Sequence, residues 1–284
     1  MSRELCAVDC TTSSVQVVVR RRSGLPAATA ADLPTEAIDD GKVMQPVAVH
    51  LYVTRLLKSL GARTVDLRVT VPDSACVSRY LEYPKMPLGN LDRSLRLEAG
   101  RELPMSPRDA YLGWQVVEIR PDRMLVLLVG TWRDVLEAYL EALDEVGRVR
   151  IAEPRSMALA RAVGSPDGVL LDWTGEDIQV VGVEGRRVTY TASTTLATGT
   201  EDSVNRLVHV IATLLPKAQG RTSAASRPLF LLGKLSERAD VAQALVSAPA
   251  GKGFDIVPQW RPPEPYRSLA NTCQVANIGL LMRN

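Results

Sequence analysis

The sequence contains few cysteines, histidines and aromatic residues, and no excess of charge of either sign. Among its 284 residues are four cysteines, two histidines and 5% aromatic side chains, and 34 Lys and Arg nearly balance 32 Asp and Glu. The cysteines form no C-x-x-C pair, so we expect buried thiols and no metal site. A net charge of +2 provides no basic face of the kind that nucleic-acid binding requires, so we expect no nucleic-acid partner.

Long hydrophobic runs are also absent. The longest apolar run, Met124 to Val129, is far shorter than the roughly 18 residues that a membrane-spanning helix needs. Residues Met1 to Cys6 show no apolar run after a charged start, so we expect no secretory signal and a cytoplasmic chain. Because 46% of the residues are hydrophobic, the composition is that of a folded protein, and the length suggests two domains or one domain with an insertion.

Hydrophobic periodicity and turn residues predict a mixed α/β chain. Strands are predicted near residues 5–9, 15–19, 64–71, 76–83, 110–119, 124–131, 149–152, 169–172, 178–183, 188–192 and 229–232, with one more inside 27–45. Helices are predicted near residues 47–60, 90–103, 134–146, 156–163, 202–215, 237–246 and 266–282. Asn90 is the expected N-cap of the second helix, and the polar stretch 216–228 is the expected linker.

Two hairpin openings in the chain can be superposed without gaps. AVDCTTSSVQVV begins at residue 7 and LLDWTGEDIQVV at residue 170, and each Gln lies seven residues after its Asp. An acidic residue at a strand end, followed by a tight polar turn, presents backbone N–H groups to an anion while the carboxylate can hold a metal ion or water. Two copies that face one cleft would hold a nucleotide phosphate chain. A chance similarity between two β-hairpins is the alternative interpretation.

The duplicated hairpin resembles the two phosphate loops of the actin, sugar kinase and Hsp70 superfamily. Within that superfamily the chain resembles the PilM family of type IV pilus assembly proteins, which is related to FtsA. The segments that carry the resemblance are AVDCTTSSVQVVV, VTVPDSACVSRYLEYPKMP, LRLEAGRELPMSPRDAYLGWQVVE, EPRSMALARAV and the tail from Ala276 to Leu280. Together they span nearly the whole chain.

The resemblance implies a fold and a domain organisation. The expected fold is α/β and actin-like, a duplicated ribonuclease H-like fold with an inserted α+β subdomain in the first half and a reduced second half. The expected first actin-like subdomain comprises residues 1–63 and 148–168, and the expected PilM- or FtsA-type insertion comprises residues 64–147. Residues 169–284 would form the second actin-like subdomain, with the linker 216–228 inside it.

The resemblance also implies a function and a partner. It suggests a cytosolic scaffold subunit of a type IV pilus or related inner-membrane assembly platform, peripheral at the inner membrane. Such a subunit would bind the N-terminal cytosolic tail of a PilN-like bitopic membrane protein in a groove beside the inserted subdomain, and would contact other platform or motor subunits. Tyr80, Tyr83 and Glu98 are candidates for that groove, because extended tails dock through backbone pairing and a few aromatic or apolar pockets. Packing within the core or at an edge strand is the alternative role for these three residues.

The candidate nucleotide-binding positions follow from the same resemblance. They are Asp9, Thr11, Thr12, Ser13, Ser14, Gln16, Asp172, Thr174, Gly175 and Gly233. Thr11 and Thr174 stand where the family has glycine, and a Cβ there restricts the approach of the backbone to phosphate. Gln16 stands where the family has a basic residue, and Gly233 is single where two adjacent glycines are usual.

These departures leave two hypotheses open. In the first, the nucleotide site has decayed, no cofactor is needed, no catalytic residue is present, and the chain is a scaffold. In the second, the chain is an ATP-binding actin-like switch or a weak ATPase that uses Asp9 and Asp172 around Mg²⁺. A small-molecule kinase of the same superfamily would need a substrate pocket in the first half, where the sequence offers the inserted subdomain instead.

Overall fold

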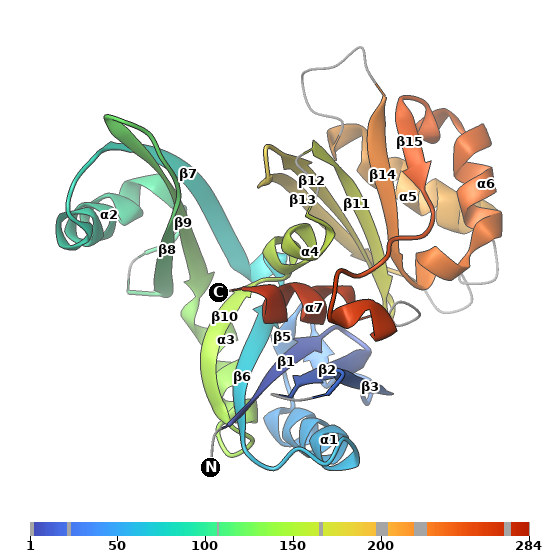
Figure 1. Cartoon of the computed structure of the whole chain (residues 1–284), viewed down its shortest axis with the longest axis horizontal. Coiled ribbons are helices and arrows are strands. Elements are labelled where there is room, and N and C mark those ends of the chain that lie inside the picture. Colours follow the sequence, from blue (N-terminus) through green and yellow to red (C-terminus); the bar gives the residue numbers. More distant parts are fainter. Residues whose placement is uncertain are drawn as a thin grey trace.

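The computed structural model of the chain describes residues 3–21, 24–106, 108–164, 167–196, 204–218, 226–269 and 274–283. Over these residues the chain forms two five-stranded sheets, a three-stranded sheet and a short two-stranded pair (Figure 1). The predicted alternation of strands and helices is confirmed in type and order for most elements.

The first five-stranded sheet is formed early in the chain. Its strands are β1 (Glu4–Cys10), β2 (Ser14–Arg20), β3 (Ala27–Asp32), β6 (Val65–Val71) and β10 (Arg148–Pro154). They lie in the order β10-β6-β1-β2-β3, with antiparallel pairing from β1 to β3 and parallel pairing of β6 with β1 and β10. Helices α1 (Pro46–Ser59) and α3 (Arg133–Leu143) pack with this sheet in one hydrophobic cluster. The small hairpin of β4 (Ile38–Asp39) and β5 (Lys42–Val43) precedes α1.

The second five-stranded sheet repeats the first. Its strands are β11 (Asp167–Thr174), β12 (Asp177–Glu184), β13 (Arg187–Thr195), β14 (Arg227–Gly233) and β15 (Phe254–Val257). They lie in the corresponding order, β13-β12-β11-β14-β15, with the same pattern of antiparallel and parallel pairs. Asp9 pairs with Gln16 in the first sheet, and Asp172 pairs with Gln179 in the second. The repeat seen in the sequence is therefore a repeat of the fold.

The third sheet is the inserted unit. It consists of β7 (Cys76–Pro84), β9 (Arg123–Trp132) and β8 (Ala110–Ile119), in the order β7-β9-β8. One face packs against α2 (Leu88–Glu102) through buried Leu91, Leu95 and Ala99. The expected insertion at 64–147 was wider than this, since β6 pairs within the first sheet and α3 packs with α1. The inserted unit therefore comprises residues 76–132.

Several predicted boundaries differ from the structure. Helix α2 begins at Leu88 after Pro87, so Asn90 lies in its first turn instead of capping it. The helix predicted over 266–282 comprises a 3₁₀ turn at Tyr266–Leu269 and a separate helix α7 (Val275–Met282), and residues 270–273 lie outside the described part.

Strand β15 was not predicted, because its sequence lies in a Gly- and Pro-rich segment. Helix α5 (Val204–Ala218) extends into the predicted linker 216–228, most of which lies outside the described residues. Helix α6 (Ala239–Ser247) matches its prediction.

Two helices lie between the two large sheets. Helix α4 (Arg155–Val163) and helix α7 share a buried cluster with Ala7 of the first sheet and Leu170 of the second (Figure 1). The Asn277 amide on α7 donates hydrogen bonds to the carbonyls of Ala7 at 3.0 Å and Gln16 at 3.2 Å. Helix α7 therefore returns from the second half of the chain to the first, although the predicted boundaries placed it wholly in the second.

The contact between α4 and α7 depends on Gly279. A Cβ at this position would lie 1.8 Å from the carbonyl oxygen of Ala158 on α4, whereas a Cβ at Gly89 on α2 would meet nothing within 4 Å. We expect Gly279→Ala to lower the free energy of unfolding by about 1–3 kcal/mol or more, because the two helices must move apart. Gly89→Ala should leave it unchanged or raise it by about 0.5–1 kcal/mol, because alanine favours the helix. Urea denaturation followed by circular dichroism measures both, and equal stabilities would contradict the close packing.

Candidate functional site

The two repeated hairpin turns touch each other. The backbone N–H of Thr12 donates to Asp177 Oδ2 at 2.8 Å, and the Thr12 hydroxyl donates to Asp177 Oδ1 at 2.9 Å. Gly175 has φ +61°, and a Cβ there would lie 2.6 Å from Thr11 Oγ1 and 2.8 Å from Ser13 Oγ. The two turns are therefore packed together and joined by hydrogen bonds of their own.

Arg155, the first residue of α4, bridges the two repeated aspartates. Its Nε donates to Asp9 Oδ2 at 3.1 Å, and its Nη2 donates to Asp172 Oδ2 at 2.7 Å. All three side chains are buried, and both carboxylates are fully so. Burial alone would lower the pKa of Arg155, but the charges of Asp9 and Asp172 outweigh it and raise the pKa above its usual value, so the guanidinium stays protonated. A single buried guanidinium therefore joins the two repeated carboxylates.

A network around Asp73 extends from this bridge. Arg155 Nη1 donates to Gln179 Oε1 at 2.9 Å, and Gln179 Nε2 donates to Asp73 Oδ2 at 2.6 Å. The same carboxylate accepts the backbone N–H of Ser156 at 2.9 Å, at the N-terminus of α4, where a helix dipole favours negative charge. Burial raises the pKa of Asp73 despite these donors. The role of Arg155 could not be predicted from its segment EPRSMALARAV, because nothing in the local sequence shows what its side chain reaches.

A small acidic cavity remains beside the touching turns. It has a volume of about 250 Å³, and its charged lining residues are Asp40, Asp73, Asp177 and Arg155. The cavity therefore carries three carboxyl groups and one guanidinium, which is already bonded to Asp9 and Asp172. The described residues include no group of His, Cys, Asp and Glu side chains that could hold a metal ion.

The other predicted nucleotide positions surround the same contact. The Ser14 hydroxyl lies 2.9 Å from that of Thr11, and Thr174 Oγ1 donates to Asp172 Oδ2 at 2.9 Å. Gly233 ends β14 with φ +63°, directly against the carbonyl oxygen of Trp173. The structure therefore gathers the predicted residues in one place, as two packed turns with their own hydrogen bonds.

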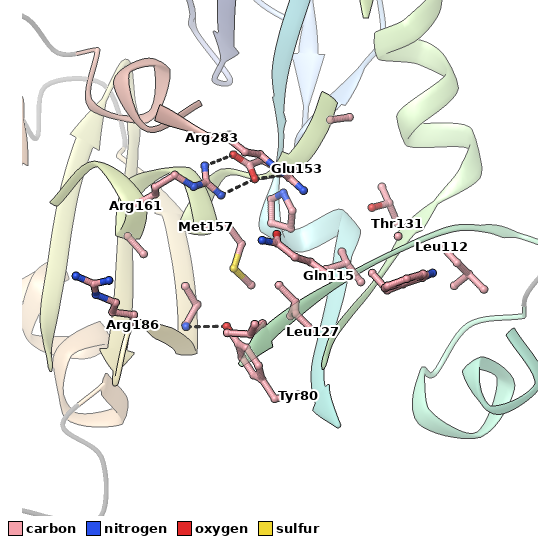
Figure 2. A pocket seen from close by; sticks show the side chains of 18 of the residues that line it. Tyr80, Leu112, Gln115, Leu127, Thr131, Glu153, Met157, Arg161, Arg186 and Arg283 are labelled. Atoms are coloured by element: carbon pink, nitrogen blue, oxygen red, sulfur yellow. Dashed lines mark hydrogen bonds and ion pairs between the residues drawn. The ribbon is translucent and has the colours of Figure 1, made fainter. Parts of the chain in front are cut away.

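A second and larger cavity lies beside the inserted sheet. This groove has a volume of about 620 Å³ and runs between the sheet and helix α4 (Figure 2). Gln115 and Leu127 line it from the sheet, and Met157 and Arg161 line it from α4. The complete lining is Tyr80, Tyr111, Leu112, Gly113, Trp114, Gln115, Val117, Leu127, Val129, Thr131, Leu136, Ala152, Glu153, Pro154, Met157, Ala160, Arg161, Gly164, Arg186, Val188, Met282 and Arg283.

Charged side chains on the α4 wall of the groove are paired with each other. Arg161 donates to Glu153 through Nη1 at 2.5 Å and Nη2 at 2.8 Å, and Arg283 donates to Glu153 Oε2 at 2.6 Å (Figure 2). The Glu153 side chain is buried. Two arginines thus share one carboxylate and join the end of α7 to the last turn of α4.

The three predicted groove residues separate in the structure. Tyr80 lines the groove, and its hydroxyl accepts the backbone N–H of Val188 on β13 at 3.1 Å, which joins the inserted sheet to the second half (Figure 2). Tyr83 lies three residues further along β7 and so projects from the opposite face. There its hydroxyl donates to Glu98 on α2 at 2.5 Å. Burial, with the nearby Glu98 charge, raises the pKa of Tyr83, so the hydroxyl remains a donor.

No protein-family model and no curated protein matches the chain. Among solved structures, the PilM-PilN type IV pilus biogenesis complex is similar with a TM-score of 0.72 and 19% identity, over 99% of this chain and 98% of that one. The chain has the actin-like fold of PilM. The ethanolamine utilization protein EutJ from Carboxydothermus hydrogenoformans has a TM-score of 0.60 at 13% identity, over 100% of this chain and 91% of that one.

The cytoplasmic domain of EpsL, an inner membrane component of the type II secretion system of Vibrio cholerae, is a more distant structural neighbour. Its TM-score is 0.51 at 15% identity, over 81% of this chain and 82% of that one. These similarities confirm the predicted actin-like fold. In the described part of the chain, no helix has the length and hydrophobicity needed to cross a membrane.

The Arg155 bridge makes a prediction about stability. Arg155→Met removes the cation between two buried carboxylates, and breaking a buried ion pair from one side costs about 3–5 kcal/mol of unfolding free energy. Adding Asp9→Asn and Asp172→Asn to the same variant should recover much of that loss, since no uncompensated charge remains. Arg93→Met on α2, an exposed arginine with no described partner, is the control and should change stability by less than about 0.5 kcal/mol. Urea denaturation measures all three, and wild-type stability of Arg155→Met would refute the bridge.

Proposed function

We propose that the chain is a scaffold subunit of a type IV pilus or related inner-membrane assembly platform. In this proposal the groove beside the inserted sheet binds the N-terminal cytosolic tail of a PilN-like membrane protein. The protein would then associate with the inner membrane through that partner, and would offer its remaining surface to other platform or motor subunits. The observation that carries the proposal is the groove itself, in a fold similar to that of the PilM-PilN complex.

The lining of the groove suits a peptide. Its walls are largely apolar, with Leu127 and Val129 on one side and Met157 and Met282 on the other. Gln115 is exposed on the sheet side of the groove and supplies an amide donor and acceptor. Apolar walls with a few fixed polar groups are typical of sites that bind short segments, where burial supplies affinity and polar groups fix orientation.

We further propose that the chain works without a nucleotide. Mg-ATP binding would require the Thr12 and Asp177 contact to open, and Arg155 to release Asp9 and Asp172. The acidic cavity beside the turns adds charge repulsion to that cost. The Arg155 guanidinium already joins the two halves of the chain. In this proposal it takes the role that a bound nucleotide and metal ion would otherwise have.

Parallel calorimetric titrations test the function. The probes are Mg-ATP and a synthetic peptide that copies the N-terminal cytosolic tail of the PilN-like protein from the same genome. We expect the peptide to bind and Mg-ATP to give no heat and no rise in melting temperature, whereas a ligand at 100 times its dissociation constant would stabilise the fold by about 2.7 kcal/mol. Binding of Mg-ATP without binding of the peptide would refute the scaffold proposal and favour an ATP-binding actin-like switch.

A groove variant locates the binding site. Gly113 lies on β8 in the groove lining, and a Cβ there would meet nothing within 4 Å, so Gly113→Leu fills the groove without disturbing the core. We expect peptide affinity to fall at least about tenfold while unfolding stability changes by less than about 0.5 kcal/mol. Gly89→Leu on α2, also in open space but outside the groove, is the matched control and should bind normally. Unchanged affinity of Gly113→Leu would place the tail elsewhere.

A further inference from the structure

We propose that the groove binds its peptide as an added β-strand, paired with the open edge of β8, and that the peptide carries a carboxylate near Arg186. This inference rests on the proposed function and specifies how the same site recognises its partner. Apolar side chains of such a peptide, on alternate residues, would face the groove walls. Main-chain hydrogen bonds to β8 would hold the peptide in register.

The lining of the groove points to the edge of β8. Successive side chains of a strand project from opposite faces of its sheet. Tyr111, Gly113 and Gln115 line the groove from one face of β8. The groove also touches Leu112 and Trp114, whose side chains pack toward α2 on the other face, so it meets the backbone of this edge strand.

Strand β9, the neighbour of β8, lines the groove from one face only. The groove-lining residues of β9 are Leu127, Val129 and Thr131, which share one face of the sheet. Strand β9 is central, with β7 and β8 on its two sides, so its edges are closed. Figure 2 shows Gln115, Leu127 and Tyr80 on the sheet side of the groove and Met157 opposite them.

The free edge of β8 lacks the usual protection against added strands. Within the described residues β8, a strand of ten residues, pairs with β9 alone, and the ladder has a register shift between Val116 and Glu118. Its sequence, AYLGWQVVEI, contains no proline or lysine, although edge strands commonly use both to prevent pairing. Val117 and Ile119 are 42% and 65% exposed. A long edge with exposed apolar side chains is a surface on which a further strand pairs readily.

The other edge of the same sheet belongs to β7, which contributes only Tyr80 to the groove lining. The Tyr80 hydroxyl accepts the backbone N–H of Val188. Glu118 of β8 forms an ion pair with Arg187 at 3.4 Å, so the Val117 end of the groove lies beside the turn between β12 and β13. These contacts fix the direction of the free edge relative to the second half of the chain.

The charges at the Val117 end of the groove indicate which kind of peptide side chain would bind there. The groove lining contains three arginines and one glutamate, and Glu153 is shared by Arg161 and Arg283. Arg186 is exposed in the turn between β12 and β13, and no hydrogen bond or ion pair to its side chain is described within the structured ranges. Arg161 and Arg283 share Glu153, so an acidic side chain of the peptide near Arg186 would face the one lining arginine for which no acidic partner is described.

Backbone methylation tests strand addition. The probe is a set of synthetic peptides that copy about the first ten residues of the PilN-like protein from the same genome, each with one N-methylated residue. In a paired strand every second N–H points to the partner. We therefore expect N-methylation to weaken binding at least about tenfold at alternate residues, and by less than about twofold at the residues between them.

The outcomes separate the inference from the function. If the unmodified peptide binds but methylation shows no alternation with a period of two, strand addition is refuted and the groove function stands. If the unmodified peptide does not bind, the proposed function fails and this inference fails with it. Amide hydrogen exchange is the second measurement: β8 amides should gain protection on binding while the free edge of β7 gains none, and equal protection of both edges would refute the assignment to β8.

A charge reversal tests the acidic contact. We expect Arg186→Glu to weaken binding of a peptide with an acidic residue at least about tenfold, because an attractive pair becomes repulsive. Arg93→Glu, which makes the same change on exposed α2 outside the groove lining, should have no effect. Equal affinities of the two variants would refute the role of Arg186.

Discussion

The structure depends on one buried ion bridge, in which Arg155 joins Asp9 of the first hairpin to Asp172 of the second. Removing three charges from water is costly, and only close geometry with further hydrogen bonds offsets that cost. Here Thr70 donates to Asp9, Thr174 donates to Asp172 and Gln179 accepts from Arg155. The bridge therefore holds the two halves of a duplicated fold together at the point where their repeated turns meet.

Helix α4 connects this bridge to the groove. Arg155 lies in its first turn and faces the aspartates, while Met157 and Arg161 of the same helix form the opposite wall of the groove from the inserted sheet. Helix α4 is buried between the two sheets and packs against α7. The ion bridge and one wall of the groove therefore lie on the same packed helix.

The inserted sheet has two faces with different roles. The face toward α2 is a small core, in which Tyr83 and Glu98 pair with each other. The face toward α4 is the groove, in which Gly113, Gln115 and Tyr80 lie. Because side chains alternate along a strand, a shift of a single residue in register would exchange these two faces. The β8–β9 ladder, which pairs Gln115 with Leu127, therefore determines which residues a partner meets.

The sequence by itself determined the repeated hairpins, because the spacing from Asp9 to Gln16 and from Asp172 to Gln179 is a local property of a two-stranded ladder. It also placed most strands and helices, and its resemblance to the PilM family indicated the actin-like fold. Only the tertiary structure decided that Arg155, 146 residues from Asp9, joins Asp9 to Asp172, and that α7 returns to the first half. The physical reason is that side-chain periodicity records which face of an element is buried, but not which distant residue it meets.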